Sequence, residues 1–136
     1  MRHRILMIEN DADDRYLTEE MFQEEGLEAD IHFVYSADAP AYISNATAGR
    51  PHLILLDRNT QPHAFTDLIR HIRQTDGYAT VPIVVLSNAS RPEDVRQAYS
   101  SGANSFITKP EDYDGARFKI KSFINYWFQS VDLPVA

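Results

Sequence analysis

The sequence contains no cysteine and no long apolar run. The absence of cysteine excludes disulfides, cysteine-ligated zinc, iron–sulfur clusters and thiol catalysis. No apolar run approaches the roughly 18 residues of a membrane-spanning helix. The run that follows the basic N-terminus, residues 5–8, is also shorter than the roughly 7–15-residue core of a signal peptide. We therefore expect a cytoplasmic protein that does not associate with membranes.

Positive charge is also scarce. The net charge of the 136 residues is −7, and this argues against binding to nucleic acid, which requires a basic face. The acidic excess is local, because residues 1–30 hold ten acidic and three basic side chains while the rest of the chain is neutral. A solvated helix face explains most of these acids. Those nearest Glu9 are candidates for a cation site.

The chain has the size and composition of one globular domain. Its 136 residues, with 43% hydrophobic and 24% charged residues, are ordinary for such a domain. No repeat, low-complexity segment or linker divides it. We expect a single domain over residues 1–136, with its core at about 3–129 and a short C-terminal tail.

Short apolar runs alternate with helical patterns along the chain. Continuous runs of this kind predict strands buried on both faces of a parallel sheet. They occupy residues 5–8, 53–56, 83–86 and 105–108, and a fifth, alternating run occupies 31–35. Helical patterns occupy 11–26, 41–48, 65–72, 90–102 (opened by a capping box, Ser90 to Glu93) and 120–131. Strict alternation of strands and helices predicts a doubly wound α/β fold.

Polar side chains with complementary chemistry follow the predicted strands. Glu9 and Asn10 follow the first, Asp57 the third, Ser87 the fourth and Lys109 the fifth. The carboxyl ends of parallel strands meet at one edge, where such sheets bind ligands. Carboxylate and amide oxygens suit Mg²⁺, a carboxylate can attack phosphorus, and a hydroxyl and a lysine can bind phosphoryl oxygens.

Each of these residues also has an ordinary structural explanation. Asp57 can be a cap, Ser87 a turn residue, Lys109 a surface lysine and Phe106 a core aromatic. Chance rarely places such groups at matching strand ends, so the joint placement favours a phosphoryl and Mg²⁺ site. The five histidines show no ligand spacing and are expected at the surface or at strand edges.

The sequence resembles a response-regulator receiver domain (CheY-like) along nearly its whole length. The segments that carry the likeness are 4–14 (RILMIENDADD), 53–57 (LILLD), 81–87 (VPIVVLS), 101–106 (SGANSF) and 107–110 (ITKP). A closer likeness is to stand-alone receivers of the cyanobacterial phytochrome-associated type, through 96–99, 102–104, 126–128 and 133–134. The resemblance implies a (βα)5 flavodoxin-like sandwich, with a five-stranded parallel sheet in the order 2-1-3-4-5.

The resemblance also implies roles for single residues. Asp57 matches the phosphoacceptor, which receives a phosphoryl group from a histidine kinase, a phosphotransfer protein or a small phosphodonor. Ser87 and Phe106 match the hydroxyl and the aromatic residue that switch together, and Lys109 matches the lysine that pairs with the phosphoryl group. Pro110 matches a proline whose preceding peptide bond is commonly cis in the family.

The implied metal ligands for Mg²⁺ are Glu9, Asn10, Asp57 and the backbone carbonyl of Asn59. The family usually has an acid where Asn10 stands. An amide brings no charge, so we expect weakened Mg²⁺ affinity, with Asp11 compensating in part through water. Arg58 replaces an aliphatic residue, and its guanidinium is expected near the acid edge. Residues 62–66 replace the usual Asp-Gly.

The leading interpretation is a response regulator of a two-component phosphorelay that signals by phosphorylation-dependent protein binding and is not an enzyme. The alternative is a pseudo-receiver that binds partners without phosphorylation. Residues 57–60 resemble the nucleophile motif of dehalogenase-type phosphatases, but this sequence has Asn59 where those enzymes have their second aspartate. A flavodoxin is also disfavoured, because no phosphate-binding loop follows the first predicted strand. The aromatic residues 126–128 suggest a possible homodimer, and Tyr99 with Phe106 suggests a coupled surface patch.

Overall fold

The computed structural model describes residues 2–45, 47 and 49–134. Its five strands form one parallel sheet in the order β2-β1-β3-β4-β5, which confirms the predicted topology. The strands are β1 (His3–Ile8), β2 (Ala29–Val34), β3 (Leu53–Asp57), β4 (Ile83–Ser87) and β5 (Ser105–Thr108). No helix among these residues is long and apolar enough to cross a membrane.

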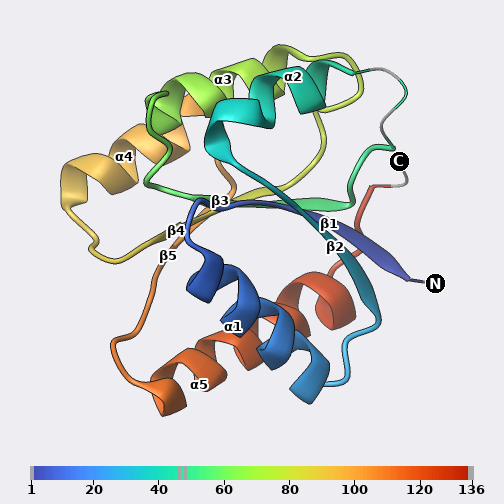
Figure 1. The fold of residues 1–136 in the computed structure, drawn as a ribbon, viewed down its shortest axis with the longest axis vertical. Helices are drawn as coiled ribbons and strands as arrows, with labels where there is room; N and C mark the ends of the chain where they lie inside the picture. Colours follow the sequence, from blue (N-terminus) through green and yellow to red (C-terminus); the bar gives the residue numbers. More distant parts are fainter. Residues whose placement is uncertain (1, 46, 48, 135–136) are drawn as a thin grey trace.

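Helices cover both faces of the sheet (Figure 1). On one face lie α1 (Ala12–Glu24) and α5 (Tyr113–Ile124). On the other lie α2 (Ala39–Ser44), α3 (Phe65–Gln74) and α4 (Pro92–Ser101). A short 3-10 turn (Ser36–Asp38) precedes α2, and one π-helical segment (Asn125–Ser130) continues α5.

Strand alternation divides the core into two layers. In β1, Leu6 and Ile8 pack on the α2–α3–α4 side, whereas Ile5 and Met7 pack on the α1–α5 side. All residues of the central strand β3 are buried, because helices cover both of its faces. Each large apolar side chain buried in this way contributes about 1.5–3 kcal/mol. The apolar runs therefore indicated the inner strands correctly.

Three local predictions need correction. β5 is half-buried along its length, because it is an edge strand with one neighbour. The helix expected over 41–48 instead begins at Ala39 and ends at Ser44, while residues 46 and 48 lie outside the described chain. The capping box is wrong, because α4 begins at Pro92 and its cap, Arg91, makes no side-chain cap bond. Proline at the first helical position sets this start.

The strand register brings the strand ends to one edge. Ile8 lies beside Leu56, Leu56 beside Val85, and Val85 beside Phe106. The residues that follow these paired positions lie at the carboxyl end of the sheet. Glu9, Asp57, Ser87 and Lys109 lie no more than three residues beyond it, as the sequence pattern predicted.

Candidate functional site

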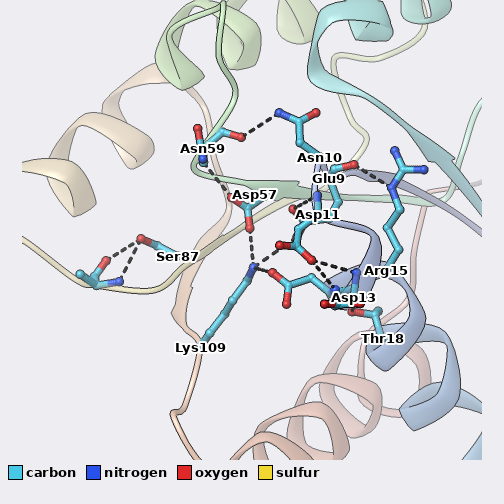
Figure 2. Close-up of polar contacts among 12 residues, drawn as sticks. Glu9, Asn10, Asp11, Asp13, Arg15, Thr18, Asp57, Asn59, Ser87 and Lys109 are labelled. Carbon is cyan, nitrogen blue, oxygen red and sulfur yellow. Dashed lines mark hydrogen bonds and ion pairs between the residues drawn. The ribbon is translucent and has the colours of Figure 1, made fainter.

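Three carboxylates surround one lysine at the carboxyl edge (Figure 2). Lys109 Nζ contacts Asp57 Oδ2, and it lies 3.2 Å from Glu9 Oε1 and 3.0 Å from Asp14 Oδ2. Glu9 and Asp57 are buried, with 3% and 7% of their surface exposed. Acids in this environment need a paired cation. Lys109 supplies that charge to all three.

The pKa values reflect this crowding. Burial raises the pKa of Glu9 to about 7, and the charge of Asp57 adds to the effect while Lys109 opposes it. Burial alone lowers the pKa of Lys109, but its hydrogen bond to Asp57 and the charges of Asp57 and Glu9 outweigh burial and raise it. The lysine therefore stays protonated at neutral pH, where it can hold anionic oxygen.

Asp14 is the site residue that the sequence did not indicate. Asp11 is the N-cap of α1, and its Oδ1 accepts hydrogen bonds from the backbone N–H groups of Asp13 (2.8 Å) and Asp14 (3.1 Å). Asp14 lies in the first turn that follows, and its side chain reaches Lys109. The signal was an acid three residues after a capping aspartate. The carboxylate of Asp11, expected to assist metal binding through water, caps α1 through its Oδ1.

The side chain of Asn10 joins two neighbouring loops. Its Oδ1 accepts a hydrogen bond from the backbone N–H of Ser36 at 2.9 Å, which fixes the orientation of the amide. Its Nδ2 then donates to Ser36 Oγ at 2.9 Å. It also donates to the backbone oxygen of Asn59 at 3.4 Å (Figure 2). The amide nitrogen therefore faces the carbonyl that the resemblance assigns to the metal. To ligate a cation through Oδ1, Asn10 must share or give up its bond to Ser36.

Other oxygen atoms at this edge suit a divalent cation. One carboxylate oxygen from each of Glu9, Asp14 and Asp57 lies within 4.8 Å of the others. Such hard oxygen ligands match the preference of Mg²⁺. Because the ammonium of Lys109 contacts all three, a cation must compete with it or shift it.

On the side of the edge near Ser87, the side chains form hydrogen bonds with the backbone of their own loops. Asp57 Oδ1 accepts a hydrogen bond from the Asn59 N–H at 2.8 Å. Ser87 Oγ donates to the backbone oxygen of Ala89 at 2.6 Å and accepts from its N–H at 3.3 Å. The Ser87 hydroxyl thus bonds to its own loop and not to Asp57. Asp57 and Ser87 nevertheless line one cavity of about 390 Å³.

Of two further predictions near the edge, the one about the cis peptide bond is wrong. The cis peptide bond of the described chain lies at Gln61–Pro62, not before Pro110. The guanidinium of Arg58 pairs with a bidentate partner in α4, and Arg58 lines the same cavity as Asp57. Its Nε lies 3.0 Å from Asp94 Oδ2, and its Cζ lies 5.0 Å from the centroid of the Phe65 ring.

The aromatic candidates occupy different environments. Phe106 is half-buried against the core, and Tyr99 is 49% exposed. In the C-terminal aromatic segment, Trp127 and Phe128 pack against the α1–α5 side of the core, whereas Tyr126 is exposed. Most of that segment therefore serves the internal packing of the domain.

Comparison with known proteins finds one matching family model and several related sequences. The family model described as "Response regulator receiver domain" matches residues 5–120. The response regulator Rcp1 of Synechocystis is 24% identical over 97% of this chain and 93% of its own length. The Bacillus subtilis transcriptional regulatory protein YxdJ is 30% identical over 90% of this chain. This chain spans about half of YxdJ, which is 50% covered.

Solved structures show the same fold. The phosphorylated cyanobacterial phytochrome response regulator RcpA superimposes with a TM-score of 0.90 at 25% identity, over 99% of this chain and 100% of its own. The Mn²⁺-bound form of Rcp1 has a TM-score of 0.87 at 23% identity, over 98% and 99%. With these matches, and with the strand order and the acidic edge already described, the chain belongs to the response regulator receiver domain family.

Proposed function

We propose that this protein is a phosphorylation-controlled binding module in which Asp57 accepts a phosphoryl group. The observation that carries the proposal is the contact of Asp57 and Lys109 at the end of the sheet, beside an accessible cavity. One Asp57 oxygen contacts Lys109, while the other accepts from a backbone N–H. The similarity to Rcp1 along nearly its whole length supports treating residues 1–136 as one receiver unit.

The proposed chemistry is a phosphoryl transfer between two carriers. An oxygen of Asp57 forms a bond to phosphorus, and the bond from phosphorus to the donor breaks, with the electron pair leaving on the donor. The donor is the phosphohistidine of a kinase or phosphotransfer protein, or a small acyl phosphate. Lys109 is placed to hold a phosphoryl oxygen, because its ammonium already contacts Asp57.

A divalent cation fits the same edge. Two similar solved structures are described with a metal ion, one as a Mn²⁺-bound form and the other with magnesium coordinated in its active-site cleft. Here Glu9, Asp57 and the backbone carbonyl of Asn59 are the proposed ligands, with Asn10 as a weak one, and Asp14 adds a carboxylate nearby. Bound Mg²⁺ would neutralise charge on the phosphoryl oxygens. We propose weakened affinity, because the Asn10 oxygen is already bonded to Ser36.

Signalling is proposed to follow from a shift between two arrangements of the cavity wall. In the described arrangement Ser87 bonds to Ala89. A phosphoryl group on Asp57 offers that hydroxyl an anionic acceptor, and half-buried Phe106 on the neighbouring strand is placed to follow. A partner protein that prefers the second arrangement would then bind more tightly.

The direct test is intact-mass analysis after incubation with acetyl phosphate and Mg²⁺. We expect a phosphoryl adduct on the wild-type protein. The adduct should be absent from Asp57→Asn, which keeps the size of the side chain but replaces the attacking carboxylate with an amide, and from samples with EDTA. An adduct that survives in Asp57→Asn would place the acceptor elsewhere, and no adduct at any Mg²⁺ concentration would contradict the proposal.

The bonds of Asn10 also favour a second candidate, a pseudo-receiver. Its amide and the ammonium of Lys109 together satisfy the edge with no metal. In that case acetyl phosphate gives no adduct with wild type, Asn10→Asp restores one, and partner binding is the same with and without phosphodonor. Adduct formation by wild type would reject this candidate.

We also propose that the protein self-associates through its C-terminal aromatic segment, residues 126–128. Of the aromatic segment, only Tyr126 presents an exposed ring. Sedimentation at tens of micromolar, a rough range for weak homodimers, should show a dimer that Tyr126→Ala weakens. A monomer under those conditions would contradict it.

A further inference from the structure

Arg58 forms an ion pair with Asp94 and lines the same cavity as Asp57. It follows Asp57 directly, and its guanidinium binds Asp94 through two bonds, Nε to Oδ2 at 3.0 Å and Nη2 to Oδ1 at 3.2 Å. Asp57, Arg58, Ser87 and Asp94 all line the cavity of about 390 Å³. A group added to Asp57 on this side would therefore lie within the region that Arg58 borders.

The ion pair fastens the beginning of α4 to the strand that ends in Asp57. Asp94 lies in the first turn of α4, and its side chain is 14% exposed against 40% for Arg58. The rest of α4 is lightly held, because only Ala98 and Ser101 are buried within it. The residue at its N-cap makes no side-chain cap bond. The pair is thus well placed to control the position of this helix.

A phosphoryl group on Asp57 would need more positive charge than the lysine can give. A phosphorylated side chain carries about −1.5 to −2 charges, and Lys109 already serves three carboxylates. Asn10 adds no charge to attract a metal. The planar fork of an arginine fits phosphoryl oxygens in pairs, and Arg58 is adjacent to the acceptor in the chain.

We propose that Arg58 exchanges Asp94 for the phosphoryl group of phosphorylated Asp57, and that this exchange frees the first turn of α4. Arg58 then acts as a second phosphoryl-binding cation, which offsets the weak metal site. Asp94 is its competitor. The inference rests on the proposed function, since it requires that Asp57 accept a phosphoryl group.

The exchange predicts opposite effects from the two members of the ion pair. Removing Arg58 removes a cation from the phosphoryl group, so phosphorylation should need more Mg²⁺. Removing the charge of Asp94 frees Arg58, so phosphorylation should need less. A pair that only holds the fold together would instead give changes of the same sign in both variants.

The test measures adduct formation by intact mass at increasing Mg²⁺, with acetyl phosphate as donor and the full chain. For Arg58→Ala we expect the Mg²⁺ concentration at half-maximal adduct to rise about tenfold. For Asp94→Asn we expect it to fall about threefold, and the double variant should match Arg58→Ala, because Asp94 acts only through Arg58. Arg91→Ala is the matched control, since Arg91 lines the same cavity, and should change it less than about twofold.

Arg58→Lys keeps the charge without the fork and should fall between wild type and Arg58→Ala, which covers the case in which the alanine variant folds poorly. In ¹⁵N-labelled wild type, the Arg58 Nε–H signal should move on phosphorylation and should also move in Asp94→Asn. An adduct that forms with an unmoved Arg58 signal, or changes of equal sign in both variants, would overturn the exchange alone. Absence of the wild-type adduct would instead reject the proposed function on which it rests.

Discussion

The carboxyl edge of the sheet has one half around Lys109 and another around Ser87 and Arg58, and the polar groups of the two halves are paired differently. Around Lys109, the buried carboxylates of Glu9 and Asp57 and the partly exposed carboxylate of Asp14 share one ammonium. Around Ser87, the hydroxyl bonds to its own loop, and Arg58 bonds to a helix that buries little surface. Buried charge demands fixed pairing, whereas a polar group beside an open cavity can change partners at low cost. The half around Lys109 therefore holds charged groups in fixed pairs, whereas the half around Ser87 can rearrange when a charge is added.

Replacing Lys109 should produce the largest loss of stability. Lys109→Ala leaves the carboxylates of Glu9, Asp14 and Asp57 without a shared cation, and breaking a buried ion pair costs about 3 kcal/mol. Urea unfolding at neutral pH without metal measures the loss. Lys119→Ala is the matched control, because Lys119 donates to the backbone oxygen of Thr108 at 2.7 Å. Equal losses in the two variants would mean that the carboxylate cluster does not depend on Lys109.

Ser87→Ala should cost less, because the group it removes from the other half of the edge is a neutral hydroxyl. Ser87 is buried, but its Oγ bonds only within its own loop. We expect a loss of about 1 kcal/mol in the free energy of unfolding. Ser100→Ala, which removes an exposed hydroxyl bonded to Gln97, should be near zero. A loss as large as that of Lys109→Ala would erase the proposed difference between the halves.

The opposite edge of the sheet supplies a pH-dependent comparison. His52 is buried just before β3, and its Nδ1 accepts the backbone N–H of Arg4 at 2.9 Å. Burial, with the charges of Arg4 and His3, lowers the pKa of His52. The unfolded chain therefore binds this proton at higher pH than the native one, so the free energy of unfolding should fall as pH drops below about 6.5.

His52→Asn, whose oxygen can accept the same N–H, tests this pH dependence. The difference in unfolding free energy between pH 7.5 and pH 5.5 should be smaller in the variant than in wild type. We expect the change to be smaller than the effect of Ser87→Ala. An unchanged difference between the two pH values would mean that His52 does not contribute to the acid sensitivity of the fold.

An exposed ion pair should show the smallest effect. Arg70 Nη1 lies 3.3 Å from Asp67 Oδ1 on the surface of α3, with side chains 54% and 75% exposed. Solvent screens such pairs, so Asp67→Ala should change the unfolding free energy by about 0.3 kcal/mol. A loss near that of Lys109→Ala would show that burial is not what separates the two kinds of ion pair.

The sequence predicted the fold because each inner strand is a continuous apolar run. Leu53–Asp57 and Ile83–Ser87 needed no tertiary information to be assigned. Element ends were predicted less well, since the start of α4 depends on Pro92 and α2 begins at Ala39 and ends at Ser44. Propensity describes the interior of an element better than its boundaries.

The sequence also predicted that one edge of the sheet holds Glu9, Asp57, Ser87 and Lys109, because strand order and register fix where the strand ends lie. It did not show which side chains bond to each other. Asp14 reaches the cluster from the first turn of α1, which Asp11 caps, and Arg58 pairs with Asp94 of α4. Both depend on how a helix sits against the sheet, which residue patterns along a single strand do not record.

The most direct test of the whole account compares the Mg²⁺ dependence of phosphorylation in wild type and Asn10→Asp. Aspartate keeps the acceptor for the Ser36 N–H and adds the charge that the amide lacks. With acetyl phosphate as donor, the Mg²⁺ concentration for half-maximal adduct on Asp57 should fall about tenfold. Asn59→Ala, which changes a side chain but keeps the backbone carbonyl, should leave it unchanged. Equal Mg²⁺ requirements in wild type and Asn10→Asp would contradict the account of a phosphoacceptor weakened at its metal site.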